Sequence, residues 1–165
     1  MKPTLAPLEQ ITALRLMARE TVPADYRDLN NHMNVRYYMA IFDEAGYPLY
    51  EMLGLTPDIL GPLNGGGFDL EHHLSYLNEV LIGDEVAVYL RMLKRTAKRM
   101  HYLMFMVNIT RGQVAAIFEC VNSYADLSVR KTAPWPAATA ARLDTLVAES
   151  DALEWPAPVC GVIAP

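Results

Sequence analysis

The residues best suited to chemistry lie together in the stretch DLNNHMN, residues 28–34, which holds one carboxylate, one imidazole and three amides. Asp28 can act as a nucleophile or, through a water molecule, as a general base. His32 can serve as a hydrogen-bond partner in such a site, and Asn34 can cap a helix and position a water or a carbonyl group. These residue types also begin ordinary helices, so an N-cap followed by a turn is the alternative interpretation.

A long helix is predicted directly after this polar stretch. Apolar residues recur there at i, i+3, i+4 and i+7, which indicates one apolar stripe: Val35, Tyr38, Met39, Phe42, Ala45, Gly46, Leu49, Met52 and Leu53. Pro48 is expected to kink or divide the helix near its end. A helix N-terminus presents unpaired N–H groups and a positive dipole end, so this helix start is suited to stabilising an oxyanion.

Strands are predicted on both sides of the helix. Residues 18–27 resemble a strand with Pro23 at an edge or bulge, and Gly65, Gly66 and Gly67 are interpreted as a chain break. Alternating or continuous apolar patterns then predict strands at 68–76, 86–92, 101–110 and 114–126, followed by a helix at 137–149. One helix cannot cover both faces of five strands, so an edge or face is expected to bury itself against another subunit, in a homodimer or homotetramer.

Composition limits the class of protein. The chain has 165 residues, 52% of them hydrophobic, which favours one domain over 1–165 with its core at about 18–136. The formal charge of −5 argues against nucleic-acid binding. We find no signal peptide, no membrane-spanning run and no metal-ligand spacing, and the two cysteines lie 40 residues apart. We therefore expect a cytoplasmic protein with reduced thiols, no membrane association and no metal.

The order of these elements resembles the hotdog-fold thioesterases of the 4-hydroxybenzoyl-CoA thioesterase type. The family signature, approximately D-x-D-x-x-G-H-V-N-N-x-x-Y, corresponds here to YRDLNNHMNVRYY at 26–38, followed by FDEAG at 42–46. HHLSYLNEVLIGDEVAV and the segment from AKRMHYLMF to NSYADL are similar to the family's second strand and last hairpin. SYLNEV, the following GD and RKTAPWP are similar to the carnitine-associated, betainyl-CoA thioesterase-like branch.

The sequence departs from that signature at four positions. Tyr26 replaces the first Asp, so Asp28 is the acid that is retained. Asn31 replaces the Gly, a mild change if the backbone needs a positive φ, because Asn tolerates that region well. Val35 and Gly46 replace the second Asn and the helix Arg.

The resemblance implies an α+β hotdog fold, in which a five-stranded antiparallel sheet wraps around one long central helix, with a C-terminal helix added. It implies an acyl-CoA thioesterase that uses Asp28 as base or nucleophile, with no cofactor other than the CoA of the substrate. Candidate substrate-binding residues are Asn31, Tyr37, Tyr38, Glu71 and His73, and the basic segment with Lys94, Arg95, Lys98 and Arg99, which could hold CoA phosphates.

Alternatives stay open at this point. Glu44 on the helix is a second candidate base, and Glu71 with His73 keeps a hydratase or dehydratase in consideration. A non-catalytic acyl-CoA-binding module is the other alternative, although it would gain nothing from an acid beside the thioester carbonyl. The acyl group, and CoA against an acyl-carrier-protein ester, are not specified by these residues.

Overall fold

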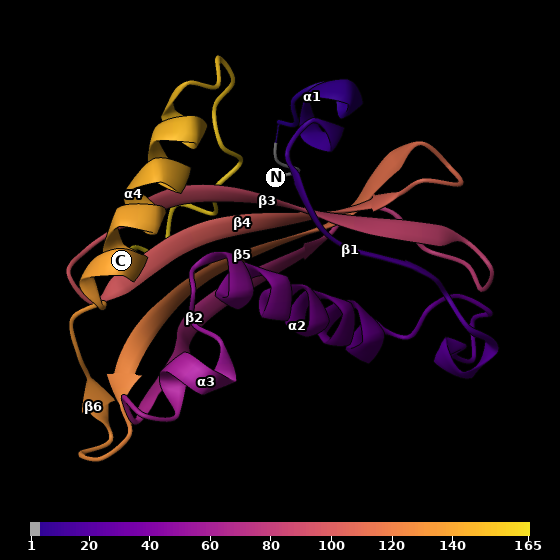
Figure 1. The fold of residues 1–165 in the computed structure, drawn as a ribbon. Coiled ribbons are helices and arrows are strands. Elements are labelled where there is room, and N and C mark those ends of the chain that lie inside the picture. Colours follow the sequence, from indigo (N-terminus) through magenta and orange to yellow (C-terminus); the bar gives the residue numbers. More distant parts are fainter. Residues whose placement is uncertain (1–3) are drawn as a thin grey trace. The chain divides into compact units, whose positions relative to one another are not determined.

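The computed structural model describes residues 4–165 and contains the predicted long helix and sheet (Figure 1). The elements in chain order are α1 Leu8–Thr12, β1 Arg15–Thr21, a 3₁₀ turn Ala24–Tyr26, α2 Val35–Met52, α3 Pro57–Leu60, β2 Gly65–Tyr76, β3 Glu85–Arg95, β4 Arg99–Asn108, β5 Gln113–Asp126, β6 Lys131–Thr132 and α4 Ala137–Asp151. The hydrogen-bonded strand order is β1-β3-β4-β5-β2, and β6 adds a short antiparallel pair to β5. The sheet thus has six strands, and the two-residue β6 was not predicted.

The chain divides into two compact units, and each of the strands β2 to β5 contributes residues to both of them. The first unit comprises residues 4–48, 74–90 and 104–118, and the second comprises 49–73, 91–103 and 119–165. The polar stretch 28–34 and most of α2 belong to the first unit.

In the first unit, α2 packs on β5 through its apolar stripe. Tyr38, Phe42 and Ala45 are buried, and the ring of Phe42 stacks on that of Phe118 at 5.2 Å. Val35 at the first turn is 57% exposed, so the stripe begins one turn later than predicted. The helix is not divided at Pro48, which lies inside it. Burial of this face fixes the helix on the sheet and thereby fixes its N-terminus.

The first strand differs from the prediction. β1 ends at Thr21, and residues 24–26 form a 3₁₀ turn after Pro23 instead of continuing the strand to 27. Pro23 has no backbone N–H for a ladder, so the chain leaves the sheet there. β1 pairs antiparallel with β3, from Arg15 opposite Leu90 to Thr21 opposite Glu85. The polar stretch therefore follows a turn and not a strand.

Strand β2 also differs from the prediction, because its apolar side chains are largely exposed. Phe68 is 64% and Tyr76 49% exposed, although alternation had predicted a buried face. β2 lies at the end of the strand order, so it has a neighbour on one side only. Gly65 and Gly67 belong to β2, where the hydroxyls of Tyr124 and Tyr50 occupy the space that a Cβ would need. These glycines allow a close approach and are not a chain break.

In the second unit, hydrogen bonds hold α4 against the C-terminal half of β3. Arg95 of β3 donates two hydrogen bonds to the carboxylate of Asp144 on α4, at 2.7 and 2.5 Å. Buried Arg91 donates to the hydroxyl of Ser150 at 3.0 Å and lies over the ring of Trp155. α4, predicted at 137–149, runs to Asp151.

Candidate active site

The loop before α2 folds around the carboxylate of Asp28. Its Oδ1 accepts the backbone N–H of Asn30 at 2.7 Å and lies 3.4 Å from that of His32. The Asp28 N–H donates to the carbonyl of His32 at 3.0 Å, and the Asn31 N–H donates to the carbonyl of Asp28 at 3.2 Å. Asn31 has φ = 64°, which confirms the predicted positive φ and closes this tight loop.

Asp28 and His32 also meet through their side chains. Oδ2 of Asp28 lies 3.1 Å from Nδ1 of His32, and the side chain of His32 is 32% exposed against 17% for Asp28. The His32 backbone pairs with Leu81, and the Met33 N–H donates to the carbonyl of Val80 at 2.8 Å. The main chain at His32 and Met33 is therefore fixed to residues 80 and 81.

Asn34 forms the N-cap of α2, as predicted. Its Oδ1 accepts the N–H of Arg36 at 3.1 Å, its carbonyl accepts the N–H of Tyr37, and its own N–H donates to the carbonyl of Tyr26 at 2.8 Å. Within residues 4–165, no acceptor is found for the N–H of Val35, the first helical residue. One amide at the positive end of the helix dipole is thus available to a ligand.

An aromatic stack supports the same helix start. The rings of Tyr26 and Tyr37 are parallel, with centroids 3.7 Å apart, and the guanidinium of Arg36 lies 4.6 Å from the Tyr37 centroid. The Tyr37 hydroxyl donates to the carbonyl of Asp25. Tyr26, which replaces the family's first acid, therefore packs against the first turn of α2. Tyr37 takes part in this stack, and its role in substrate binding stays a prediction.

Tyr38, the other aromatic candidate, is buried in the first unit. It is 5% exposed and meets the ring of Tyr76 edge to face at 5.1 Å. Burial raises the pKa of the Tyr38 hydroxyl, so this group stays neutral near pH 7. Tyr38 therefore packs against Tyr76 of β2 and is largely closed to solvent.

A second pair of acids occurs in this unit. Burial, and then the charge of Glu44, raises the pKa of the Glu20 carboxyl, and the buried Oε1 of Glu20 has no hydrogen-bond partner among the described residues. Glu44 itself is exposed on α2. Glu44, the alternative base, is therefore close enough to the carboxylate of Glu20 on β1 for their charges to repel.

The remaining predicted binding residues lie in the second unit. Glu71 and His73 are exposed on β2 and share one face with Asp69, because side chains alternate along a strand. Asp69 accepts a hydrogen bond from the amide of Asn122 at 2.6 Å, and Asn122 accepts one from the hydroxyl of Tyr50 at 3.1 Å.

The hydrogen-bonded series from Tyr50 through Asn122 to Asp69 was not predicted from the sequence. Burial raises the pKa of Tyr50 to about 12, so its hydroxyl donates as a neutral group. The one sequence signal for it was an Asn in a largely apolar strand that also holds Glu119 and Ser123, and the partners on β2 and α2 carry no local sign.

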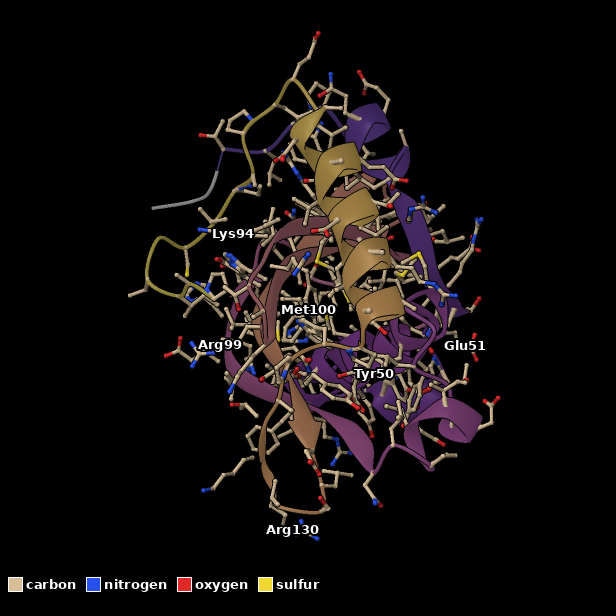
Figure 2. The ribbon with its side chains drawn as sticks, turned by 60° about the vertical axis from the view of Figure 1, so that its left-hand side comes forward. Tyr50, Glu51, Lys94, Arg99, Met100 and Arg130 are labelled. Atoms are coloured by element: carbon tan, nitrogen blue, oxygen red, sulfur yellow. The ribbon has the colours of Figure 1, made fainter. Side chains whose placement is uncertain are left out.

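The basic segment lies at the turn from β3 to β4. Lys94 and Arg99 are exposed, and the Nζ of Lys98 reaches the carbonyl of Thr132 on β6 at 3.3 Å. Figure 2 shows Lys94 and Arg99 pointing outward on the same side of the second unit. The fourth predicted residue, Arg95, is paired with Asp144 on α4, so the exposed patch holds three of the four cations.

Residues 4–165 contain neither a metal-ligand cluster nor a membrane-spanning helix. No three His, Cys, Asp or Glu side chains within residues 4–165 are grouped so that they could hold a metal ion. None of the helices in this range has the length and apolar character needed to cross a membrane.

Comparison with known proteins supports the resemblance. The thioesterase-like superfamily matches residues 22–143. Betainyl-CoA thioesterase of Pseudomonas aeruginosa is 29% identical over 139 residues, which are 84% of this chain and 87% of the relative. SAV2348 of Staphylococcus aureus, solved in complex with CoA, has a TM-score of 0.82 at 24% identity, covering 92% of this chain and 96% of the other. Slr0204 of Synechocystis, a 1,4-dihydroxy-2-naphthoyl-CoA thioesterase, has a TM-score of 0.67 at 16% identity, covering 81% and 96%.

These likenesses confirm the predicted hotdog fold with its added C-terminal helix. The matched segment covers well over half of the sequence and includes the loop at 28–34 and the whole of α2. The chain belongs to the thioesterase-like superfamily, and its class is that of the thioester hydrolases.

Proposed function

We propose that this protein hydrolyses acyl-CoA thioesters to a carboxylic acid and free CoA at the loop before α2. The observation that carries the proposal is the Asp28–His32 pair, whose members lie seven and three residues before Val35 and its unpaired N–H. Thioester hydrolysis needs an activated water or a nucleophile at one side of the carbonyl and a hydrogen-bond donor at its oxygen. The acid–base pair and the helix N-terminus supply these two parts within one short segment.

The leaving group needs little assistance in this reaction. A thiol has a pKa near 8.5, so the CoA thiolate departs without a strong acid. The barrier therefore lies mainly in the attack on the carbonyl and in the negative charge that develops on its oxygen. An amide N–H at a helix N-terminus stabilises such a charge because the dipole adds to the hydrogen bond.

The known proteins that this chain is similar to support the CoA ester as the substrate. Betainyl-CoA thioesterase and 1,4-dihydroxy-2-naphthoyl-CoA thioesterase act on CoA esters by name, and SAV2348 was solved with CoA. The basic patch of Lys94, Lys98 and Arg99 offers cations for the phosphates of CoA. Cationic and aromatic acyl groups are both substrates to include, since the two named relatives differ in this respect.

The test is release of thiol, followed with a thiol-reactive dye, from a panel of short polar, betainyl, aromatic and medium-chain acyl-CoA esters. We expect turnover of at least one ester, and a loss of about 10²–10⁴-fold in kcat for Asp28→Asn. Asp58→Asn, the same change on exposed α3, is the matched control and should keep wild-type kcat. Absence of thiol release from every ester at high protein concentration would contradict the proposal.

We also propose that the protein is a homo-oligomer that pairs through β2. This edge strand is 12 residues long and exposes Phe68, Leu70 and Tyr76, which an isolated chain would leave open to aggregation. Sedimentation of the wild type should give a multiple of the 18.5 kDa chain, and Phe68→Lys should shift the protein toward the monomer. A monomeric wild type would refute this part. A cytoplasmic location is likewise a prediction, which fractionation of the cells that produce the protein would test.

A further inference from the structure

The loop hydrogen bonds distinguish the two members of the Asp28–His32 pair. Both carboxylate oxygens of Asp28 are engaged: Oδ1 accepts the Asn30 N–H at 2.7 Å, and Oδ2 lies 3.1 Å from Nδ1 of His32. A carboxylate whose oxygens accept hydrogen bonds is a weaker nucleophile, because its lone pairs are engaged. To attack a thioester directly, Asp28 would have to give up contacts that hold the loop together.

The imidazole is arranged in the opposite way. Nδ1 of His32 faces the carboxylate, and a neutral imidazole that donates its Nδ1–H leaves Nε2 as the acceptor nitrogen. The backbone of His32 is fixed by the carbonyl contact with Asp28 and by the bridge to Leu81, and the ring itself is oriented through its Nδ1. The His32 side chain is about twice as exposed as that of Asp28. In this tautomer Nε2 is the basic nitrogen of the ring, and it belongs to the more exposed side chain of the pair.

We infer that His32, through Nε2, is the catalytic base of this site and that Asp28 is its positioning residue. The inference rests on the proposed thioesterase function and assigns roles within that same site. Asp28 holds the tautomer and orientation of the ring and stabilises the imidazolium that forms, and it makes no bond to the substrate.

The reaction balances without any further reactant. Nε2 takes one proton from water while the water oxygen bonds to the thioester carbon, and the carbonyl electrons move to an oxyanion beside the Val35 N–H. The oxyanion then collapses, the C–S bond breaks, and the sulfur leaves with the electron pair and receives the proton from Nε2. The products are a carboxylic acid, which ionises in water, and CoA with a free thiol, and His32 returns to its neutral form.

The alternative role for Asp28 predicts a different intermediate. Attack by its carboxylate would form a mixed anhydride of Asp28 and the acyl group. Water that opens this anhydride at the Asp28 carbonyl leaves its oxygen atom in the Asp28 side chain, whereas water that attacks the acyl carbonyl leaves its oxygen atom in the released acid. Single turnover in H₂¹⁸O with enzyme in excess detects an anhydride that is opened at the Asp28 carbonyl. Rapid acid quench followed by mass spectrometry of the Asp28 peptide detects an acyl adduct whichever carbonyl water attacks, and we expect no such adduct. We expect ¹⁸O in the released acid and none in the peptide that contains Asp28, as measured by mass spectrometry. Label in that peptide would overturn the inference while leaving the thioesterase function intact.

Variants supply a second, independent readout. The His32→Ala substitution should lower kcat by about 10²–10⁴-fold. Added imidazole should restore turnover in proportion to the concentration of its neutral form. Asp28→Asn should lower kcat by a similar factor, because an amide N–H facing Nδ1 moves the ring proton to Nε2, and imidazole should not rescue it. The double variant should be no worse than either single one, since the two residues act as one unit.

Each result decides between the roles. Residual activity in His32→Ala that exceeds one tenth of wild type, without a response to imidazole, would refute His32 as the base. Circular dichroism of both variants checks that the loop changes leave the fold intact, and Asp58→Asn again serves as the control. If the wild type cleaves no thioester at all, the proposed function fails and this inference fails with it.

Discussion

Asn34 offers the sharpest test of how the helix start serves the site. Its side-chain Oδ1 caps the Arg36 N–H at 3.1 Å, and Asn34→Ala removes that acceptor. An N-cap contributes about 1 kcal/mol, with a range of about 0.5–2. Arg36 is exposed, so water can replace the lost acceptor, and we expect a cost near 1 kcal/mol. For a chain of this length, that corresponds to a fall of about 2–4 °C in Tm.

The same substitution should also reduce activity. A frayed first turn no longer aims the Val35 N–H, and loss of one oxyanion donor lowers kcat by up to about 10²–10³-fold. Asn34→Asp separates the two effects, because Asp caps a helix as well as Asn does but adds a negative charge beside the developing oxyanion. We expect the Asp variant to keep the wild-type Tm and still lose kcat.

Thermal unfolding by circular dichroism and thiol release measure these outcomes on the same samples. A wild-type Tm for Asn34→Ala would show that the cap contributes nothing to stability. Full kcat in Asn34→Asp would show that the carbonyl oxygen of the substrate does not lie at this helix terminus. Either result would refute the reasoning that joins the cap to the chemistry.

Three further outcomes follow from the described contacts. Tyr50→Phe leaves the side-chain amide oxygen of Asn122 without its donor and should cost about 1–3 kcal/mol by urea denaturation, whereas Tyr47→Phe, on the exposed side of α2, should cost almost nothing. Burial and then the charge of Glu44 raise the pKa of the Glu20 carboxyl in the folded protein. The stabilising effect of the bound proton is therefore complete below the pKa of this carboxyl in the unfolded chain, and it is lost as the pH rises through the pKa in the folded protein. Glu20→Gln should therefore stabilise the protein at pH 7 by less than about 1 kcal/mol, with no gain at pH 3. Arg99→Ala should raise KM for an acyl-CoA but not for the matching acyl-pantetheine, which lacks the phosphates; equal effects on both would exclude a phosphate contact.

Local physical chemistry explains which parts of the site could be predicted. The left-handed conformation of Asn31 and the cap at Asn34 depend on preferences of single residues and their near neighbours, and both predictions are confirmed. The long helix depends on a strong periodic pattern, and its start at Val35 is also confirmed. Such features are fixed by a few adjacent residues, so one sequence is enough to find them.

Features that depend on distant pairing could not be predicted in the same way. Alternation in β2 shows which residues share a face, but it does not show that the strand has a neighbour on one side only, so Phe68 was wrongly expected to be buried. The chain from Tyr50 through Asn122 to Asp69 joins three elements separated by up to 72 residues. The register that brings these elements together is set by tertiary packing and has no local signature.

The departure at Tyr26 has a consequence for the chemistry. The family pattern has two acids before the helix, and here the first position holds a ring that stacks on Tyr37 while its backbone carbonyl accepts the Asn34 N–H. That position therefore supports the helix start. Burial raises the pKa of the Tyr26 hydroxyl, so this group stays neutral near pH 7 and does not replace the missing carboxylate as a base. In the proposed reaction, the acid–base work at this loop is therefore assigned to the Asp28–His32 pair. A Tyr26→Asp substitution, which restores the second acid, should lose the stack and lower Tm, and it should not raise kcat. A gain in kcat would show that the first acid still has a place in this site.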